Sequence, residues 1–184
     1  MDSELARFIA SGRQLTEESV VWGSHMPFHV TYYLGGKAPP LQYVTSVRAV
    51  VFQANSVLAV RDAASHFHIV PGGRREGIET LEETLRQELL EETGWTVAGI
   101  SSLGFTHFHH LAPKQAEYTY PYPDFLQLLY IAEAGSYVPD ARVPGEYELE
   151  TGFVPIDKIR RAGLEQSQAM LLDAATELRR SMGR

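Results

Sequence analysis

The sequence predicts an α/β (α+β) fold in which helices pack on a mixed β-sheet. Runs of β-branched and apolar residues at 47–52 and 56–60 predict two strands joined as a hairpin. The chain ends in a segment, residues 164–182, whose leucines and alanines recur with helical spacing. The predicted helices fall between predicted strands without regular β-α-β alternation, and this order favours a mixed sheet over a parallel one.

The best-defined element is a helix at residues 80–93. Thr80 and Glu83 have the spacing of a capping box, and Gly94 follows the predicted end. In chain order the other expected elements are a short helix at 3–10, a strand at 29–33, the hairpin strands, a short strand at 66–70, strands at 97–108, 125–132 and 152–155, and the final helix.

Two consecutive prolines, Pro39 and Pro40, divide the chain into an N-terminal arm at residues 1–45 and a main domain at residues 46–184. The arm is expected to contain a short helix and a strand. It could pack on its own domain or on a second subunit, so a homodimer formed through the arm is one hypothesis.

Composition excludes several classes of protein. The 184 residues are 44% hydrophobic, as in an ordinary globular chain, and no apolar run approaches the roughly 18–20 residues that span a bilayer. A net charge of −7 gives no electrostatic support for general nucleic-acid binding. The absence of cysteine excludes thiol nucleophiles and thiolate zinc sites. Because the N-terminal residues also lack the basic and then apolar order of a secretory signal, we expect a cytoplasmic protein.

The helix at 80–93 carries an unusual concentration of acid. Glu88, Glu91 and Glu92 stand at i, i+3 and i+4, and so lie on one helical face, where like charges repel. A bound cation would reverse this repulsion, and carboxylate oxygens favour Mg²⁺ or Mn²⁺. Leu81, Leu85 and Leu89 form an adjacent stripe that we expect to pack in the core. The alternative for the acids is a solvated face with ordinary surface ion pairs.

This segment resembles the Nudix box of the Nudix hydrolases, Gly-x5-Glu-x7-Arg-Glu-U-x-Glu-Glu-x-Gly-U, where U is a bulky apolar residue. The motif covers residues 73–95, and one position departs from it, because Gln87 stands where the family has arginine. A neutral amide offers hydrogen bonds without the charge of a guanidinium. The matching residues are Gly73, Glu79, Glu88, Leu89, Glu91, Glu92, Gly94 and Trp95.

The resemblance implies a Nudix-like fold, with the mixed β-sheet sandwiched between helices. It also implies Mg²⁺-dependent hydrolysis of a nucleoside diphosphate linked to another group X, with Mn²⁺ as a further candidate ion. It implies metal ligation by Glu88, Glu91, Glu92 and the carbonyl of Gly72, with Glu88 and Glu92 as the catalytic carboxylates. The general base in this family can instead lie outside the box, and the candidates here are Glu146, Glu148 and Glu150. The candidates for substrate binding are Arg48, Arg74 and Glu148, and Arg61 is a further cation that could reach phosphate.

Other interpretations stay open at this point. Gln87 leaves open a Nudix-fold nucleotide-binding or sensor domain with weakened turnover, and the substrate could be a non-nucleotide diphosphate. His107, His109 and His110 could bind a metal or phosphate, or could be exposed or internally hydrogen-bonded near the end of a strand. His66 and His68 could line the cleft. The aromatic residues that could stack on a base are Trp22, Phe28, Tyr43 and those at 118–123.

Overall fold

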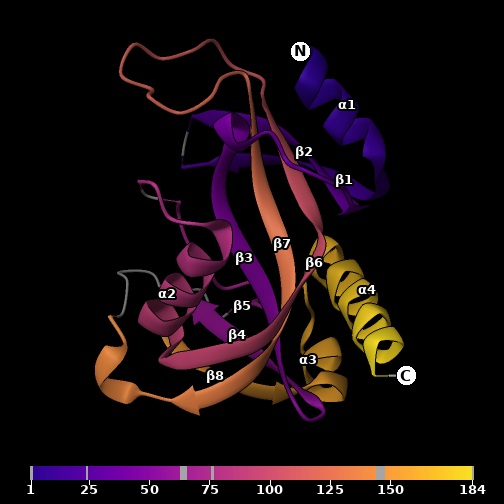
Figure 1. Ribbon diagram of the computed structural model, residues 1–184, viewed down its shortest axis with the longest axis vertical. Helices are drawn as coiled ribbons and strands as arrows, with labels where there is room; N and C mark the ends of the chain where they lie inside the picture. Colours follow the sequence, from indigo (N-terminus) through magenta and orange to yellow (C-terminus); the bar gives the residue numbers. More distant parts are fainter. Residues whose placement is uncertain (1, 24, 63–65, 76, 144–147, 184) are drawn as a thin grey trace.

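The structure is a computed structural model that describes residues 2–23, 25–62, 66–75, 77–143 and 148–183 (Figure 1). The side chains of residues 62, 148 and 149 lie outside this description. The helices are α1 (Ser3–Ser11), α2 (Leu81–Thr93), α3 (Ile156–Ala162) and α4 (Gln166–Met182), with short 3-10 turns η1 (Leu41–Tyr43) and η2 (Pro139–Ala141). The strands are β1 (Gly12–Trp22), β2 (Met26–Gly35), β3 (Val44–Gln53), β4 (Ser56–Asp62), β5 (Phe67–His68), β6 (Trp95–His110), β7 (Asp124–Tyr137) and β8 (Glu148–Pro155).

The strands form one mixed sheet in the order β1-β2-β6-β7-β3-β4-β5, and β8 also pairs with β4. Strands β3 and β7 pair in parallel, whereas the other pairs are antiparallel. Helices cover both faces of this sheet, as predicted. Figure 1 shows α4 and α2 on opposite sides of the central strands.

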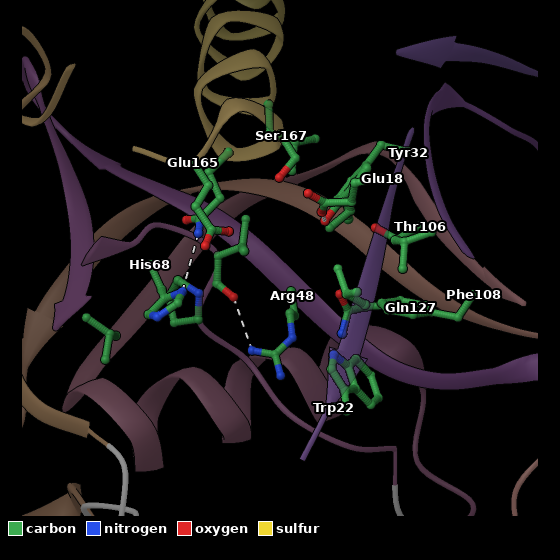
Figure 2. A pocket seen from close by; sticks show the side chains of 18 of the residues that line it. Glu18, Trp22, Tyr32, Arg48, His68, Thr106, Phe108, Gln127, Glu165 and Ser167 are labelled. Carbon is green, nitrogen blue, oxygen red and sulfur yellow. Dashed lines mark hydrogen bonds between the residues drawn. The ribbon is translucent and has the colours of Figure 1, made fainter. Parts of the chain in front are cut away.

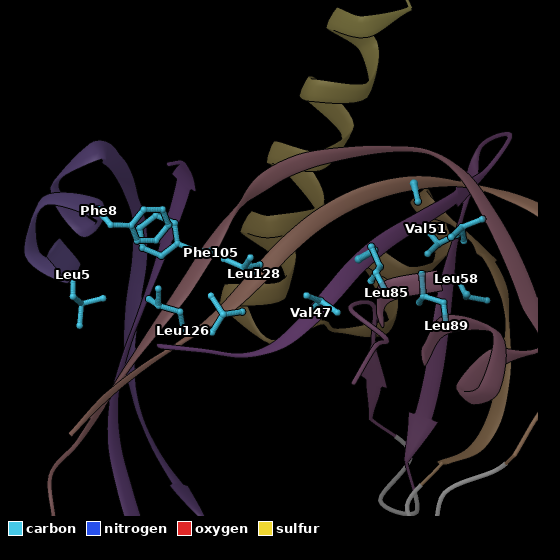
Figure 3. Packing of buried hydrophobic residues seen from close by; sticks show 14 residues of the cluster. Leu5, Phe8, Val47, Val51, Leu58, Leu85, Leu89, Phe105, Leu126 and Leu128 are labelled. Carbon is cyan, nitrogen blue, oxygen red and sulfur yellow. The ribbon is translucent and has the colours of Figure 1, made fainter. Parts of the chain in front are cut away.

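Side-chain alternation along β3 divides the core between the two faces. Val47, Ala49 and Val51 pack with leucines of α2 and with α1 in one buried cluster. Val50 and Phe52 face the other way and pack with α3 and α4 in a second cluster. Figure 3 shows the first cluster, in which Leu85 and Leu89 of α2 lie against β3. The core position predicted for Leu85 and Leu89 is confirmed, because both are fully buried, and Leu81 is partly buried against the same cluster.

The N-terminal arm is part of the same sheet. Strand β2 pairs with β6 over seven residues on each strand, from Phe28 opposite His110 to Leu34 opposite Gly104. Phe8 of α1 contacts Phe105 of β6 with their ring centroids 4.4 Å apart, so the arm packs on its own chain (Figure 3). A homodimer through the arm stays a prediction. None of the described helices is both long enough and apolar enough to cross a bilayer.

Three elements differ from the sequence-based expectation, and one of them is helix α3, where no helix was expected. Strand β1 was not expected, because its residues are mainly polar and lack apolar alternation; it forms nonetheless, by pairing with β2 from Gly12 to Trp22 at the edge of the sheet. The strand expected at 66–70 is only the two residues Phe67 and His68. Beyond it the chain leaves the β4 ladder and runs beside β3, where it builds the site described below.

Candidate active site

The loop at residues 71–73, here called the glycine loop, runs along β3. The Val47 N–H donates to the Gly73 carbonyl and the Ala49 N–H to the Pro71 carbonyl, each at 3.0 Å. Between these two bonds, the Gly72 N–H donates instead to Glu92 Oε2 on α2, at 2.5 Å. The loop therefore connects the sheet to the acidic helix through its backbone.

A side chain at either glycine would meet a close contact, with the backbone at Gly72 and with a side chain at Gly73. Gly72 has φ +135°, a conformation that side chains rarely adopt, and a Cβ there would collide with the backbone of β3 at Val47. A Cβ on Gly73 would collide with the carboxylate of Glu88. Two carboxylates of the helix, those of Glu88 and Glu92, thus reach two neighbouring residues of the loop.

The third acid predicted as a metal ligand, Glu91, is held differently. Its Oε1 accepts a hydrogen bond of 2.9 Å from the Gln87 side-chain amide one turn earlier, so the residue that replaces the family arginine contacts a box glutamate. Among the described residues, no three His, Asp or Glu side chains are arranged as a preformed metal-binding group. The neighbouring Arg86 points elsewhere, donating to Glu82 and to the Val97 carbonyl.

Helix α2 is fixed at both ends, which sets the positions of its glutamates. The Thr80 hydroxyl accepts from the Glu83 N–H, and the Glu83 carboxylate accepts from the Thr80 N–H, completing the predicted capping box. Gly94 ends the helix in the left-handed conformation. Near this end, the Arg142 Nε donates to the Glu92 carbonyl at 3.2 Å.

A cavity of about 620 Å³ opens beside the glycine loop, on the face of the sheet that α4 covers (Figure 2). Glu92 and Pro71 form the edge nearest the loop, and Arg48 of β3 also lines it. Strands β1, β2, β6 and β7 provide one wall, and the first turns of α4 provide another. The described lining residues are Glu18, Val20, Trp22, Val30, Tyr32, Arg48, Val60, His68, Val70, Pro71, Glu92, Thr106, Phe108, Gln127, Leu129, Glu165, Ser167, Gln168 and Leu171.

The predicted substrate-binding residues are placed in different surroundings. Arg48 lies inside the cavity and uses one donor, Nη1, on the Val70 carbonyl at 3.2 Å, while a guanidinium has five donors in all. Arg74 lies outside the lining, where its Nη1 donates to the Tyr120 hydroxyl at 2.7 Å and its guanidinium covers the Tyr120 ring. Arg61 pairs with Glu150 on β8, at 2.8 Å.

The candidate bases outside the box are only partly described. Glu146 lies outside the described residues. Glu148 begins β8, but its side chain is outside the description as well. Glu150 is largely exposed and carries the ion pair to Arg61.

The histidines fall into two groups. His107 and His109 both bond to Oδ1 of the buried Asp124, at 2.9 and 2.8 Å, and this bears out the internally hydrogen-bonded alternative. Burial lowers the pKa of His107, and Asp124 opposes the shift only in part. His110 contacts the Tyr118 hydroxyl, and burial lowers its pKa as well. His68 lines the cavity and is within 3.3 Å of the Gln168 amide, whereas His66 is exposed and is absent from the described lining.

Of the aromatic candidates, Trp22 is the one found among the described lining residues, where its ring lies 5.0 Å from that of Phe108. Several lining residues were not predicted from the sequence. The available signal was weak: Gln127 stands between two leucines of β7, Thr106 follows an apolar residue in β6, and Glu18 belongs to the unexpected strand β1. The unpredicted polar residues of the lining are Glu18, Tyr32, Thr106, Gln127, Glu165, Ser167 and Gln168.

A mixed sheet between helices, with a glycine loop held against an acidic helix beside a cavity, defines a Nudix-type hydrolase architecture. A family model described as "NUDIX domain" matches residues 42–174, more than half of the chain, and the chain belongs to this family. It is therefore a Nudix-type hydrolase by family. No curated protein shows significant sequence similarity to it.

Solved structures agree with this fold. The NUDIX hydrolase from Nitrosomonas europaea is 20% identical, with a TM-score of 0.56 and coverage of 73% of this chain and 89% of that one. The pyrophosphohydrolase BsRppH of Bacillus subtilis, solved in a mutant form, is 15% identical, with a TM-score of 0.57 and coverage of 89% and 97%. The NUDIX domain of Shewanella oneidensis NrtR, complexed with ADP ribose, is 17% identical, with a TM-score of 0.53 and coverage of 77% and 93%.

Proposed function

We propose that this protein hydrolyses a diphosphate linkage in a nucleoside diphosphate derivative, NDP-X, in a Mg²⁺-dependent reaction. One observation carries the proposal: Glu88 and Glu92 reach the Gly72–Gly73 loop at the edge of a cavity of about 620 Å³. This volume lies within the roughly 300–1,000 Å³ that small-molecule sites have in proteins. The ADP ribose in the related NrtR NUDIX domain supports a nucleotide derivative as the ligand.

The donor set fits a magnesium ion. Mg²⁺ is commonly held by one or two carboxylates together with waters and substrate phosphates, so it does not require a preformed group of three side chains. Glu88 and Glu92 would hold it, the Gly72 carbonyl would contribute from the loop, and Glu91 would join after releasing Gln87. When bound, the ion neutralises phosphate oxygens and lowers the pKa of a bound water, and Mn²⁺ would serve in the same way.

The chain's own residues supply the remaining chemistry. Arg48 donates hydrogen bonds to phosphate oxygens with the guanidinium donors that Val70 does not use. Water attacks one phosphorus, the bridging P–O bond breaks, and a box carboxylate, Glu88 or Glu92, takes the proton of the water. The Gly72 N–H fixes the orientation of Glu92 by its 2.5 Å hydrogen bond.

The test is to incubate the purified chain with a panel of nucleoside diphosphate derivatives and non-nucleotide diphosphates, with and without Mg²⁺, in water enriched in heavy oxygen. Mass spectrometry should detect two phosphate products, only with Mg²⁺, and one of them should carry a single heavy oxygen atom. Cleavage of non-nucleotide compounds alone would replace the substrate class proposed here. Saturable nucleotide binding without any product would instead identify a sensor domain, the alternative that Gln87 raises.

A further inference from the structure

The floor of the cavity carries a row of polar side chains that crosses three strands. Tyr32 of β2 is directly opposite Thr106 of β6, and Thr106 is directly opposite Gln127 of β7. We call these three residues the polar row. In the neighbouring rows on the same face these strands carry apolar residues, with Val30 opposite Phe108 on one side and Leu129 on the other. The flanking strands add charged residues to those rows, Glu18 opposite Val30 and Arg48 opposite Leu129. A few polar groups on an otherwise apolar floor, with charged groups beside them, are typical of a ligand site rather than of a hydrated surface.

One member of the polar row lacks the partner that buried hydroxyls normally have. The Thr106 side chain is fully buried, and its Oγ1 has no hydrogen-bond partner. A buried polar atom left without a partner destabilises a fold, and such atoms in native proteins call for a specific explanation. Because this hydroxyl lies in the cavity lining, a bound ligand is the partner that would satisfy it.

Two members of the polar row present hydrogen-bond acceptors to the cavity. The Tyr32 hydroxyl donates its proton to Glu18 Oε1 at 2.6 Å, which leaves its oxygen as an acceptor. The Gln127 amide donates to the Ser46 hydroxyl at 3.0 Å, so its carbonyl oxygen is left to accept. Burial and the contact with Glu18 both raise the pKa of Tyr32, so its hydroxyl keeps its proton at neutral pH.

The charge of the cavity also favours a ligand group that donates hydrogen bonds. Glu18, Glu92 and Glu165 contribute three carboxylates, against the single guanidinium of Arg48. In Figure 2, Glu18, Tyr32, Thr106 and Gln127 lie to one side of Arg48 and His68 to the other. An anionic group would be repelled from the side of Glu18, whereas a neutral group rich in donors would be bound there. The exposed ring of Trp22 and the buried ring of Phe108 add flat apolar surface on the side of the cavity where the polar row lies.

From these observations we infer that the cavity binds a nucleobase that carries an exocyclic amino group, and that the polar row with Glu18 and Glu165 recognises this amine. The inference rests on the proposed function for the identity of the cavity as the substrate site. Arg48 would then face the phosphates, and the base would lie between the polar row and Trp22. An amino group presents two donors to these acceptors, where the oxo group of inosine or uridine presents an acceptor.

The experiment measures binding without turnover. Isothermal titration calorimetry of the full chain with AMP, CMP, IMP and UMP compares two pairs of nucleotides that differ in an amino against an oxo group. We expect AMP and CMP to bind at least about fivefold more tightly than IMP and UMP, corresponding to one net hydrogen bond of about 1 kcal/mol. Equal affinities within both pairs, or no binding of any of the four, would overturn the inference.

Two variants locate the recognition. Thr106→Val removes only the hydroxyl, and should weaken AMP binding about fivefold while leaving the melting temperature unchanged or higher, since an unsatisfied buried group is lost. Glu165→Gln should reduce the ratio of the affinity for AMP to the affinity for IMP. The matched control is Thr31→Val, the same change at a buried position of β2 next to Tyr32, where side chains point to the opposite face. If Thr106→Val binds AMP as the parent does, the polar row does not recognise the base.

The two proposals fail separately. Hydrolysis of diphosphates together with equal binding of amino and oxo nucleotides would leave the proposed function in place and remove the inference. Preferential binding of amino nucleotides without any hydrolysis would do the opposite.

Discussion

The contact between Gly73 and Glu88 allows a sharp test of the active site. In a Gly73→Ala variant the added Cβ would occupy the position of the Glu88 carboxylate, which must move away by more than about 1 Å to restore a normal contact. Misplacing a catalytic group by this distance reduces turnover about 100-fold. We therefore expect kcat to fall by about two orders of magnitude.

The free energy of unfolding should respond differently from kcat, because the atoms that the new Cβ would meet belong to the far end of the flexible Glu88 side chain. Gly73 does not have the positive φ that disfavours alanine, so Gly73→Ala should leave the free energy of unfolding unchanged or raise it by about 0.4–1 kcal/mol. Gly72→Ala should instead lose about 1–3 kcal/mol, because its φ of +135° and the Val47 backbone both exclude a side chain.

The assay is steady-state hydrolysis of a diphosphate identified by the substrate panel, alongside thermal unfolding of the same samples. Gly152→Ala is the matched control, since a Cβ at Gly152 has no atom within 4 Å and its φ is not in the left-handed region. It should keep parental kcat. If Gly73→Ala also keeps parental kcat, the position of Glu88 against the loop is irrelevant to catalysis.

Three further changes have defined outcomes. Thr80→Ala removes the N-cap of α2 and should lower the free energy of unfolding by about 1 kcal/mol and the melting temperature by about 2–4 °C, as followed by circular dichroism; an unchanged melting temperature would contradict the role of the cap. Gln87→Arg restores a charged donor beside Glu91 and should raise kcat, by less than about tenfold because a neutral hydrogen bond already exists; lower turnover would indicate that glutamine is the required residue. Because burial lowers the pKa of His107 below 6.5, the unfolded chain binds more protons below that pH. Stability is then full above about pH 6.5 and falls as the pH drops towards the folded-state pKa, and urea unfolding at about pH 7.5 and about pH 5.5 should show a smaller difference in His107→Asn than in the parent.

The sequence predicts the parts of this fold that depend on local pattern. The helix at 80–93 follows from its cap and leucine stripe, and the structure has α2 at Leu81–Thr93 with Leu85 and Leu89 buried. The mixed sheet follows from the order of elements. Strand β1 could not be predicted in this way, because it is held by backbone pairing with β2 and its polar side chains carry no strand signal.

The candidate site also has a part that local sequence predicts and a part that depends on contacts between distant residues. The Nudix box is contiguous in sequence, so its resemblance to the family is visible without a structure. The cavity depends on register between strands distant in sequence: Thr106 and Gln127 become neighbours only because β6 and β7 pair at those residues. Likewise, the sequence does not distinguish a Glu91 carboxylate bonded to Gln87 one turn earlier from one turned towards the loop, because a glutamate on that face can make either contact.

The most direct test of the central claim is Mn²⁺ binding measured by electron paramagnetic resonance on the parent, Glu92→Gln and Glu82→Gln. Glu82 lies on the same helix, away from the predicted metal ligands, and pairs with Arg86. If the box carboxylates hold the ion, Glu92→Gln should bind Mn²⁺ at least about tenfold more weakly and lose most metal-dependent turnover, while Glu82→Gln should match the parent. Equal Mn²⁺ affinity in all three proteins would contradict the assignment of the metal to this helix.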